Sequence, residues 1–373
     1  MGECARLPAL WIIAYPDKIV EMSSLRVCIL SLSLVLASSG LAQSSPAPRV
    51  DALIHEEMAR QHIPGVAVGV VRNGEVVMAK GYGFANLELG AKVTPETVFK
   101  IASVSKQFIA AAVMLLVQDG KLGLDDPLAG FFEDAPNGWR RITLRHLLSH
   151  TSGFERELPG WDYLKTYSEA EIEAMARQGK IEFAPRERYQ YSNTAYFLLG
   201  LVVSKVSGKP WADFMRKRVF EPLGMNATRA TTWRDLVPNR ASGYDWSGSG
   251  WTNDRALLSV RTSGAFLSSV TDLARWEAAL VTNRVLTAAS LRQMGAATRL
   301  AGGGSHPYGL GWNLEEYRGR RAMGHGGALL GFRSHYLRLL DDGLTVIVLA
   351  NSSSANAGLL AQRLAACWLP DLD

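Results

Sequence analysis

The chain has 373 residues, of which 47% are hydrophobic and 20% are charged, a composition typical of a folded globular protein with a sizeable core. Its formal net charge of +5 is modest, and no dense run of lysine and arginine interleaves with aromatic residues. These features argue against a nucleic-acid-binding protein, and the sequence leaves the oligomeric state open.

The N-terminal segment has the features of a secretory signal peptide. An apolar run at 27–37 follows Arg26, and small residues come after it. A positive residue, a short apolar core and a small-residue site are typical of such signals, and the run is shorter than the roughly 20 residues that cross a membrane. Because Met22 is a better start for this signal than the first methionine, we interpret residues 1–42 as an upstream extension plus the signal. We expect a periplasmic or secreted protein with no stable membrane anchor after cleavage.

The cysteines and histidines give no metal-binding pattern. Cys4 and Cys28 fall in the segment that export removes, so Cys367 alone remains, without a partner for an intrachain disulfide or a metal cluster. His146 and His150 stand four residues apart, a spacing that suits zinc, but no third ligand lies nearby. We expect neither a metal nor a cofactor.

The first part of the mature chain predicts a helix, a hairpin and a second helix. Apolar residues at helical spacing predict a helix over 51–61. Two β-rich runs, 66–71 and 75–82, flank Arg72-Asn73-Gly74, and Asn-Gly is a strong hairpin signal. The apolar run 101–117 predicts a buried helix. We assign residues 49–123 to an α/β domain.

Short helices and polar loops then predict a largely helical insert over 124–250. Its expected helices are 142–150, 170–178, 194–207 and 211–219. The α/β domain resumes over 251–373, with expected helices at 269–280 and 359–368 and expected strands at 308–312, 333–339 and 344–350. The last strand is continuous and β-branched, as in the centre of a sheet. We expect both ends of the chain to share one sheet.

Ser103 and Lys106 form an S-x-x-K pattern at the start of the 101–117 run. Residues three apart on a helix share one face, so a lysine that loses its proton through burial can act as base for the serine hydroxyl. The alternative is that Ser103 caps the helix and Lys106 extends to water.

Two later motifs carry side chains of the same chemistry. In Tyr191-Ser192-Asn193, a tyrosine hydroxyl can relay protons if nearby positive charge lowers its pKa, and Asn193 offers both a donor and an acceptor to a substrate amide. The alternative is a surface loop with a helix cap.

The third motif is His325-Gly326-Gly327-Ala328, placed just before an expected strand. Its glycines allow a ligand close to the backbone, and a backbone N–H there can help that of Ser103 to form an oxyanion hole. The alternative is a glycine-rich turn with an exposed histidine.

In this order, the three motifs resemble those of serine β-lactamases and penicillin-binding DD-peptidases. The surroundings are similar to the class C-like branch, which includes esterases and D-amino-acid peptidases. The matching stretches are Phe99 to Ser103, Ile142 to Gly153, Glu221 to Met225, Tyr308 to Trp312 and Gly324 to Gly327. The resemblance covers residues 50–370 and implies an α/β (α+β) fold with a mostly antiparallel sheet, flanking helices and an inserted helical subdomain.

The resemblance also implies a role for each motif residue. Ser103 is acylated, while Lys106 and Tyr191 share the proton transfer. Asn193 holds a substrate amide, and His325, Gly326, Gly327 and Ala328 line the substrate site. The backbone N–H groups of Ser103 and Ala328 form the oxyanion hole.

His325 stands where most β-lactamases carry lysine, and a largely neutral histidine is a poor partner for the β-lactam carboxylate. Arg333, close by in sequence, is a second candidate for a substrate carboxylate, with a strand-end salt bridge as the alternative. We expect an exported serine hydrolase that cleaves an amide or ester of a D-amino-acid peptide, an ester or a β-lactam. The alternative function is a non-catalytic penicillin- or peptidoglycan-binding module of the same fold.

Overall fold

The computed structural model describes residues 47–230, 232, 234–254, 262–264 and 266–369. All of them fall in a unit that runs from Ser45 to Asp373. The predicted extension and signal, residues 1–42, lie outside the described residues. None of the described helices is long and apolar enough to cross a membrane.

The helices and strands have the following bounds. The helices are α1 (Ala47–Arg60), α2 (Lys106–Gln118), α3 (Leu144–Leu148), α4 (Glu169–Gln178), α5 (Asn193–Ser207), α6 (Trp211–Met215), α7 (Glu221–Leu223), α8 (Val270–Val281), α9 (Ala288–Met294) and α10 (Ala357–Trp368). The strands are β1 (Gly65–Arg72), β2 (Glu75–Asn86), β3 (Ala91–Lys92), β4 (Phe99–Lys100), β5 (Arg229–Ala230), β6 (Tyr244–Trp246), β7 (Trp251–Asn253), β8 (Phe266–Ser268), β9 (Thr298–Arg299), β10 (Ser305–His306), β11 (Asn313–Tyr317), β12 (Arg320–Leu329), β13 (Phe332–Leu339) and β14 (Leu344–Ala350).

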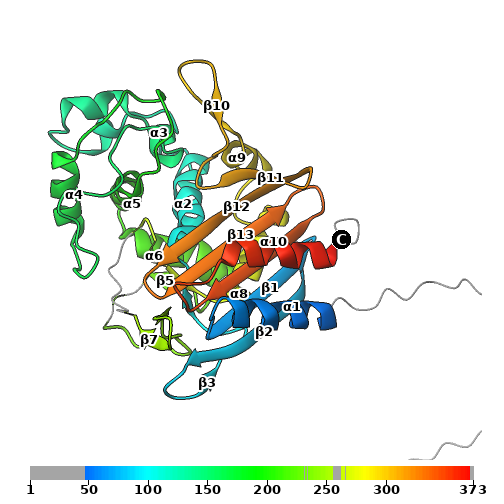
Figure 1. Ribbon diagram of the computed structural model, residues 1–373. Helices are drawn as coiled ribbons and strands as arrows, with labels where there is room; N and C mark the ends of the chain where they lie inside the picture. The colour runs from blue at the N-terminus through cyan, green and yellow to red at the C-terminus, as the bar shows by residue number, and fades with distance from the viewer. Residues whose placement is uncertain (1–46, 231, 233, 255–261, 265, 370–373) are drawn as a thin grey trace, which may run out of the picture. The chain divides into compact units, whose positions relative to one another are not determined.

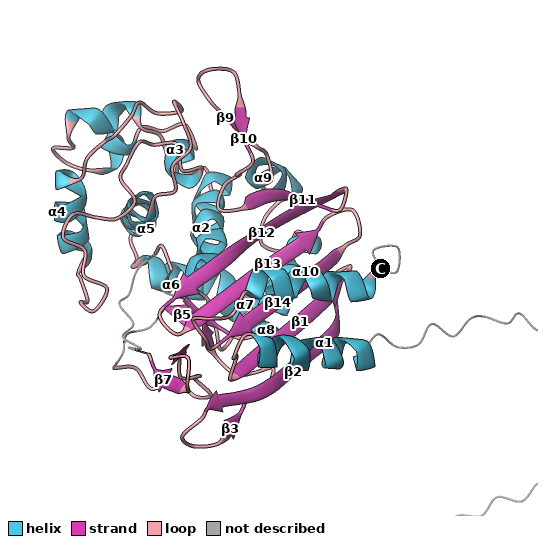
Figure 2. Cartoon of the chain, in the orientation of Figure 1, coloured by secondary structure: helices cyan, strands magenta, loops and turns pink. Residues whose placement is uncertain are grey.

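The main sheet joins the two ends of the chain, as predicted. Its order is β11-β12-β13-β14-β1-β2-β3, and each neighbouring pair is antiparallel. Figure 2 shows these strands side by side with helices on both faces. The hairpin between β1 and β2 turns at Asn73 and Gly74, whose φ values of +52° and +85° suit the predicted Asn-Gly turn. The predicted mostly antiparallel sheet flanked by helices is confirmed.

The central strands are buried on both faces, which explains their continuous β-branched sequences. On β1, Val66, Val68 and Val70 pack with α1 and α10, whereas Ala67 and Val71 belong to the core with α2 and α8. Figure 1 shows α1 and α10 across one face of the sheet. The other face therefore carries the buried helix α2, which begins at Lys106.

The division into an α/β domain and a helical insert stays a prediction. The segment 124–250 contains α3 to α7, as expected of the insert, and it also contains β5 and β6.

One local prediction is wrong and another is incomplete. The expected strand at 308–312 is a turn that precedes β11, and its glycines approach other backbone closely. A Cβ on Gly309 would lie 1.9 Å from the Met294 carbonyl oxygen, and Gly311 has a φ of +81° against α2. His325 precedes β13, the expected strand at 333–339, but it also lies inside a strand that the sequence did not predict, β12. Because the alternation of apolar residues cannot report such close approaches, the sequence pattern missed the turn.

Candidate active site

Ser103 lies in a short 3₁₀ turn, Ala102–Ser105, that leads directly into α2. Lys106 is the first residue of α2 and its side chain is fully buried. Its Nζ lies 3.3 Å from Ser103 Oγ and donates to Asn193 Oδ1 at 2.9 Å and to the Ser263 carbonyl at 2.7 Å. The predicted juxtaposition of this serine and lysine is present, and Lys106 does not extend to water.

Tyr191 approaches the same serine from the start of α5. The hydroxyl of Ser192 caps this helix by accepting from the Ala195 N–H at 3.1 Å, which fixes the chain next to the tyrosine. The Tyr191 hydroxyl donates to Ser103 Oγ at 2.8 Å. The condition for a proton relay, a pKa lowered by nearby positive charge, is not met, because burial raises the pKa of Tyr191 above the usual value. Tyr191 is therefore a protonated hydroxyl at neutral pH.

Asn193 links the lysine to an acidic residue. Its Oδ1 accepts from Lys106, and its Nδ2 donates to Glu157 Oε1 at 2.5 Å. Glu157 Oε2 has no hydrogen-bond partner among the described residues, and the side chain is 27% exposed. Sequence reasoning missed Glu157, because it lies in a loop without pattern, 36 residues before Asn193.

The edge of strand β12 runs beside Ser103. Pairing with β11 ends at Gly324, opposite Asn313, so the following residues leave one edge of β12 unpaired by that strand. A Cβ on Gly327 would lie 2.3 Å from the Ile101 carbonyl oxygen and 2.2 Å from Ser334 Oγ. Only glycine therefore lets the turn that bears Ser103 pack against this strand.

His325 is neutral and has both ring nitrogens engaged. Its Nδ1 lies 2.6 Å from the Gly326 carbonyl oxygen and its Nε2 lies 3.2 Å from the Tyr308 hydroxyl. Burial is the largest cause that lowers the pKa of His325, to about 3. The side chain therefore supplies no positive charge to a substrate carboxylate, and Tyr308 is a neighbour that sequence reasoning did not assign.

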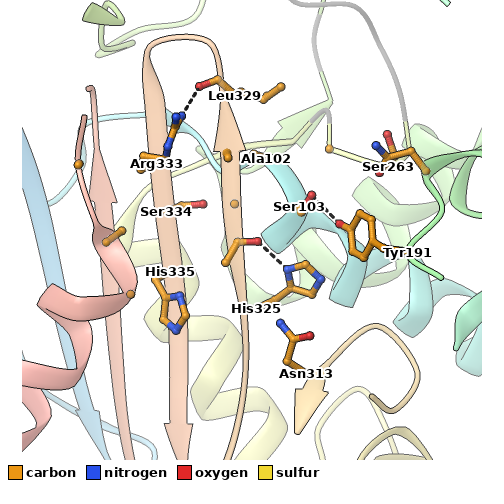
Figure 3. A pocket seen from close by; sticks show the side chains of 18 of the residues that line it. Ala102, Ser103, Tyr191, Ser263, Asn313, His325, Leu329, Arg333, Ser334 and His335 are labelled. Carbon is orange, nitrogen blue, oxygen red and sulfur yellow. Dashed lines mark hydrogen bonds between the residues drawn. The ribbon is translucent and has the colours of Figure 1, made fainter. Parts of the chain in front are cut away.

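A cavity of about 760 Å³ opens above these groups (Figure 3). The predicted site residues that line it are Ser103, Tyr191, Asn193, His325, Gly326, Gly327 and Ala328, whereas Lys106 lies buried beneath them. Glu157, Asn313 and His335 also line it, without a signal in the sequence. Arg333 lies at its rim, where its Nη1 donates to the Leu329 and Phe332 carbonyls, and no described carboxylate forms an ion pair with it.

Comparisons with known proteins match most of the chain. A family model described as Beta-lactamase matches residues 50–366. Penicillin-binding protein 4* of Bacillus subtilis is 28% identical over 323 residues, which cover 80% of this chain and 70% of that protein. D-aminopeptidase of Brucella canis is 29% identical over 336 residues, 87% of this chain but only 63% of that relative. The structure of D-amino acid amidase from Ochrobactrum anthropi SV3 with D-phenylalanine has a TM-score of 0.76 at 26% identity, covering 87% of this chain and 99% of that one.

Proposed function

This chain belongs to the beta-lactamase family of serine hydrolases, and on that premise we propose that it is an exported enzyme that cleaves an amide or ester of a D-amino acid through an acyl-enzyme on Ser103. One observation carries the proposal. Ser103 Oγ lies within reach of both Lys106 Nζ, at 3.3 Å, and the Tyr191 hydroxyl, at 2.8 Å. Such a convergence suits an activated nucleophile, whereas a helix cap does not need it.

Lys106 is the proposed base. As a neutral amine, Nζ keeps two N–H donors for Asn193 Oδ1 and the Ser263 carbonyl, and its lone pair faces Ser103 Oγ. Ser103 then gives its proton to Lys106 while Oγ bonds to the substrate carbonyl carbon. The protonated Tyr191 hydroxyl donates to Oγ and stabilises the charge that develops there.

The tetrahedral intermediate then collapses to the acyl-enzyme. We assign its oxyanion to the backbone N–H groups of Ser103 and Ala328, both of which line the cavity. The bond to the leaving group breaks, and the proton that Lys106 took from Ser103 passes to the leaving nitrogen or oxygen. In the deacylation step, water attacks the acyl carbon and loses a proton to Lys106. The bond from the acyl carbon to Ser103 Oγ then breaks, and Lys106 returns a proton to Oγ.

Two side chains support a substrate with a free amino group rather than a β-lactam. The neutral His325 offers no charge to a β-lactam carboxylate. Glu157 presents a carboxylate oxygen beside Asn193, where it suits an ammonium group next to the scissile carbonyl. The names D-aminopeptidase and D-amino acid amidase of two similar proteins support the D configuration.

Replacing the nucleophile tests the proposal. Ser103→Ala is expected to abolish hydrolysis of D-phenylalanine amide and labelling by a fluorescent phosphonate, because no other group takes the place of Oγ. Ser105→Ala is the matched control, since the hydroxyl of Ser105 accepts from the Phe266 N–H and does not reach the cavity lining. If the Ser103→Ala protein is still labelled, the assignment of the nucleophile is wrong.

A non-catalytic penicillin-binding module is the second candidate, and the similarity to a penicillin-binding protein favours it. Intact-mass measurement after penicillin, with a panel of p-nitrophenyl esters and D-amino acid amides, separates the two functions. Turnover of the esters and amides supports the hydrolase. A long-lived penicillin adduct without turnover of any substrate supports the binding module.

A further inference from the structure

His150 contacts both sides of Tyr191, although it belongs to none of the three motifs. It follows α3, is fully buried and has a φ of +57°, a region that residues other than glycine rarely adopt. In this conformation its carbonyl accepts from the Gln190 N–H at 2.9 Å. Its ring Nδ1 accepts from the Ser192 N–H at 3.1 Å. The two bonds hold the backbone immediately before and after Tyr191.

The ring of His150 also packs on the ring of Tyr191. The two ring centroids lie 4.3 Å apart with an interplanar angle of 34°. Backbone bonds and ring contact together fix where the Tyr191 hydroxyl meets Ser103 Oγ, at 2.8 Å. A shift of His150 therefore moves the hydroxyl that serves the nucleophile.

The other nitrogen of His150 leads to the third motif. Its Nε2 lies 3.2 Å from the Tyr308 hydroxyl, which lies 3.2 Å from His325 Nε2, and Tyr308 is itself fully buried. The far end of the chain is His325 Nδ1, at 2.6 Å from the Gly326 carbonyl oxygen. Four contacts thus join the Ser192 backbone to strand β12.

The two ends of this chain fix which ring nitrogen of each histidine carries the proton. The Ser192 N–H can only donate, so His150 Nδ1 is the acceptor and a neutral ring carries its proton on Nε2. The Gly326 carbonyl can only accept, so His325 carries its proton on Nδ1. Tyr308 then accepts from His150 and donates to His325 Nε2. Each ring nitrogen has one partner and one role.

The surroundings keep both rings neutral. Ionisable groups from several elements interact electrostatically with the two imidazoles. They are Lys106 of α2, near both rings, Arg156, near His150, and His335 of β13, near His325. Burial is the largest cause that lowers the pKa of both histidines, and this effect does not depend on a charge on Lys106. Four described tyrosines pack around the cluster, and burial raises the pKa of each, so all stay protonated: Tyr189, Tyr191, Tyr196 and Tyr308.

We infer that His150 is a positioning residue for two catalytic motifs, holding Tyr191 through its carbonyl and Nδ1 and, through Tyr308, fixing the proton on His325. The inference rests on the proposed function, in which Tyr191 serves Ser103. It assigns to Tyr308 a second positioning role, which keeps the third motif uncharged toward the substrate. Neither residue touches the reacting atoms.

Separate variants test the contact of His150 with the backbone around Tyr191 and its contact, through Tyr308, with His325. His150→Ala removes the acceptor for the Ser192 N–H and is expected to lower kcat/KM for D-phenylalanine amide by about 10²-fold, as for a misplaced catalytic group. His150→Asn restores an acceptor and tolerates a positive φ, so it is expected to recover about tenfold or more of that loss. Tyr308→Phe removes the donor to His325 Nε2, which stabilises the neutral imidazole. It is therefore expected to raise the pKa of His325, and with it one ionisation in the pH–rate profile, by about one unit.

Tyr189→Phe is the matched control. Its ring packs edge-on to His150 at 5.8 Å, yet its hydroxyl has no hydrogen-bond partner among the described residues. This variant is expected to keep the wild-type rate and pH profile. That result would show that loss of a hydroxyl from the same aromatic cluster does not by itself change the rate or the pH profile. Circular dichroism confirms that each variant is folded, and if His150→Ala does not fold, His150→Asn and Tyr308→Phe carry the test.

Two results would overturn the inference. One is a folded His150→Ala protein with the wild-type kcat/KM. The other is ¹⁵N NMR of histidine-labelled wild-type protein at neutral pH in which His325 carries its proton on Nε2, or on both nitrogens. Failure of the wild-type protein to react with a phosphonate would overturn the proposed function instead, and the tautomer measurement, which needs no activity, then decides the inference alone.

Discussion

Ser103 Oγ contacts two buried groups, Tyr191 and Lys106, which have different roles in the proposed proton transfer. Tyr191 keeps its proton because burial raises its pKa, so it donates to Ser103 Oγ instead of accepting from it. In the proposed mechanism, proton removal is therefore left to Lys106, which lies beneath the cavity against Asn193 and the Ser263 carbonyl.

Glu157 is the residue that we expect to select the amino group. Glu157→Gln keeps an oxygen that accepts from Asn193 but removes the negative charge. We expect the KM for D-phenylalanine amide to rise about tenfold with little change in kcat, since a hydrogen bond to a charged group contributes about 1.5 kcal/mol or more. Steady-state kinetics against an N-acetylated D-phenylalanine ester, which carries no ammonium, is the internal comparison.

Glu155 provides the matched variant for that experiment. Its Oε1 accepts from the Lys180 N–H and it does not line the cavity. Glu155→Gln removes the same charge two residues away and is expected to leave the KM unchanged. An equal KM change for the free and the acetylated substrates in Glu157→Gln would rule out recognition of the ammonium group.

Strand β12 is the element that brings the third motif to the nucleophile. The Ser334 hydroxyl of neighbouring β13 donates to the Ile101 carbonyl at 2.7 Å, which ties the sheet to the turn that bears Ser103. Gly327 lies between these two groups, whereas a Cβ on Gly326 would meet its nearest atom, His335 Nδ1, at 3.4 Å. A side chain is therefore sterically excluded at Gly327 but not at Gly326.

Gly327→Ala is expected to lower the free energy of unfolding by about 1–3 kcal/mol, because the added methyl overpacks the contact with Ile101 and Ser334. Gly326→Ala adds the same methyl in ordinary van der Waals contact and is expected to lower it by less. Urea unfolding of both variants measures the difference. Equal destabilisation by the two would contradict the close approach at Gly327.

The elements that the sequence predicted correctly carry strong local signals. The Asn73-Gly74 hairpin and the β-branched run of β14 follow from turn chemistry and strand propensity. The turn at 308–312 could not be predicted, because its glycines are required by close contact with the backbone of α2 and of Met294, which are distant in sequence. The three motifs were recognisable as patterns, whereas His150 meets Ser192 and Tyr308 across 42 and 158 residues, beyond any local pattern.

At the scale of the whole molecule, several imidazoles are held neutral at once. Burial lowers the pKa of His146 and His335 to about 4 and that of His325 to about 3, and it places that of His150 well below its ordinary value. In the unfolded chain these groups take up protons below about pH 6.5. Between that pH and about pH 4 the unfolded state therefore binds more protons than the folded state.

Stability is therefore expected to fall as the pH drops below about 6.5. Each imidazole that stays neutral in the folded state lowers the free energy of unfolding by about 1.4 kcal/mol per pH unit, since the unfolded state binds a proton that the folded state does not. Urea unfolding at pH 7 and pH 5 measures the change, and His335→Gln is expected to make it shallower by one proton. Equal or greater stability at pH 5 would contradict the assignment of neutral buried histidines.

The central claim is that Ser103 is acylated during turnover, and trapping the intermediate tests it most directly. The wild-type protein is mixed with D-phenylalanine p-nitrophenyl ester, quenched in acid at short times and digested with trypsin. We expect a phenylalanyl adduct on Ser103 in the peptide between Lys100 and Lys106, rising and then decaying as D-phenylalanine is released. Release of D-phenylalanine with no adduct at any time, or with the adduct on Ser105 or elsewhere, would contradict the account.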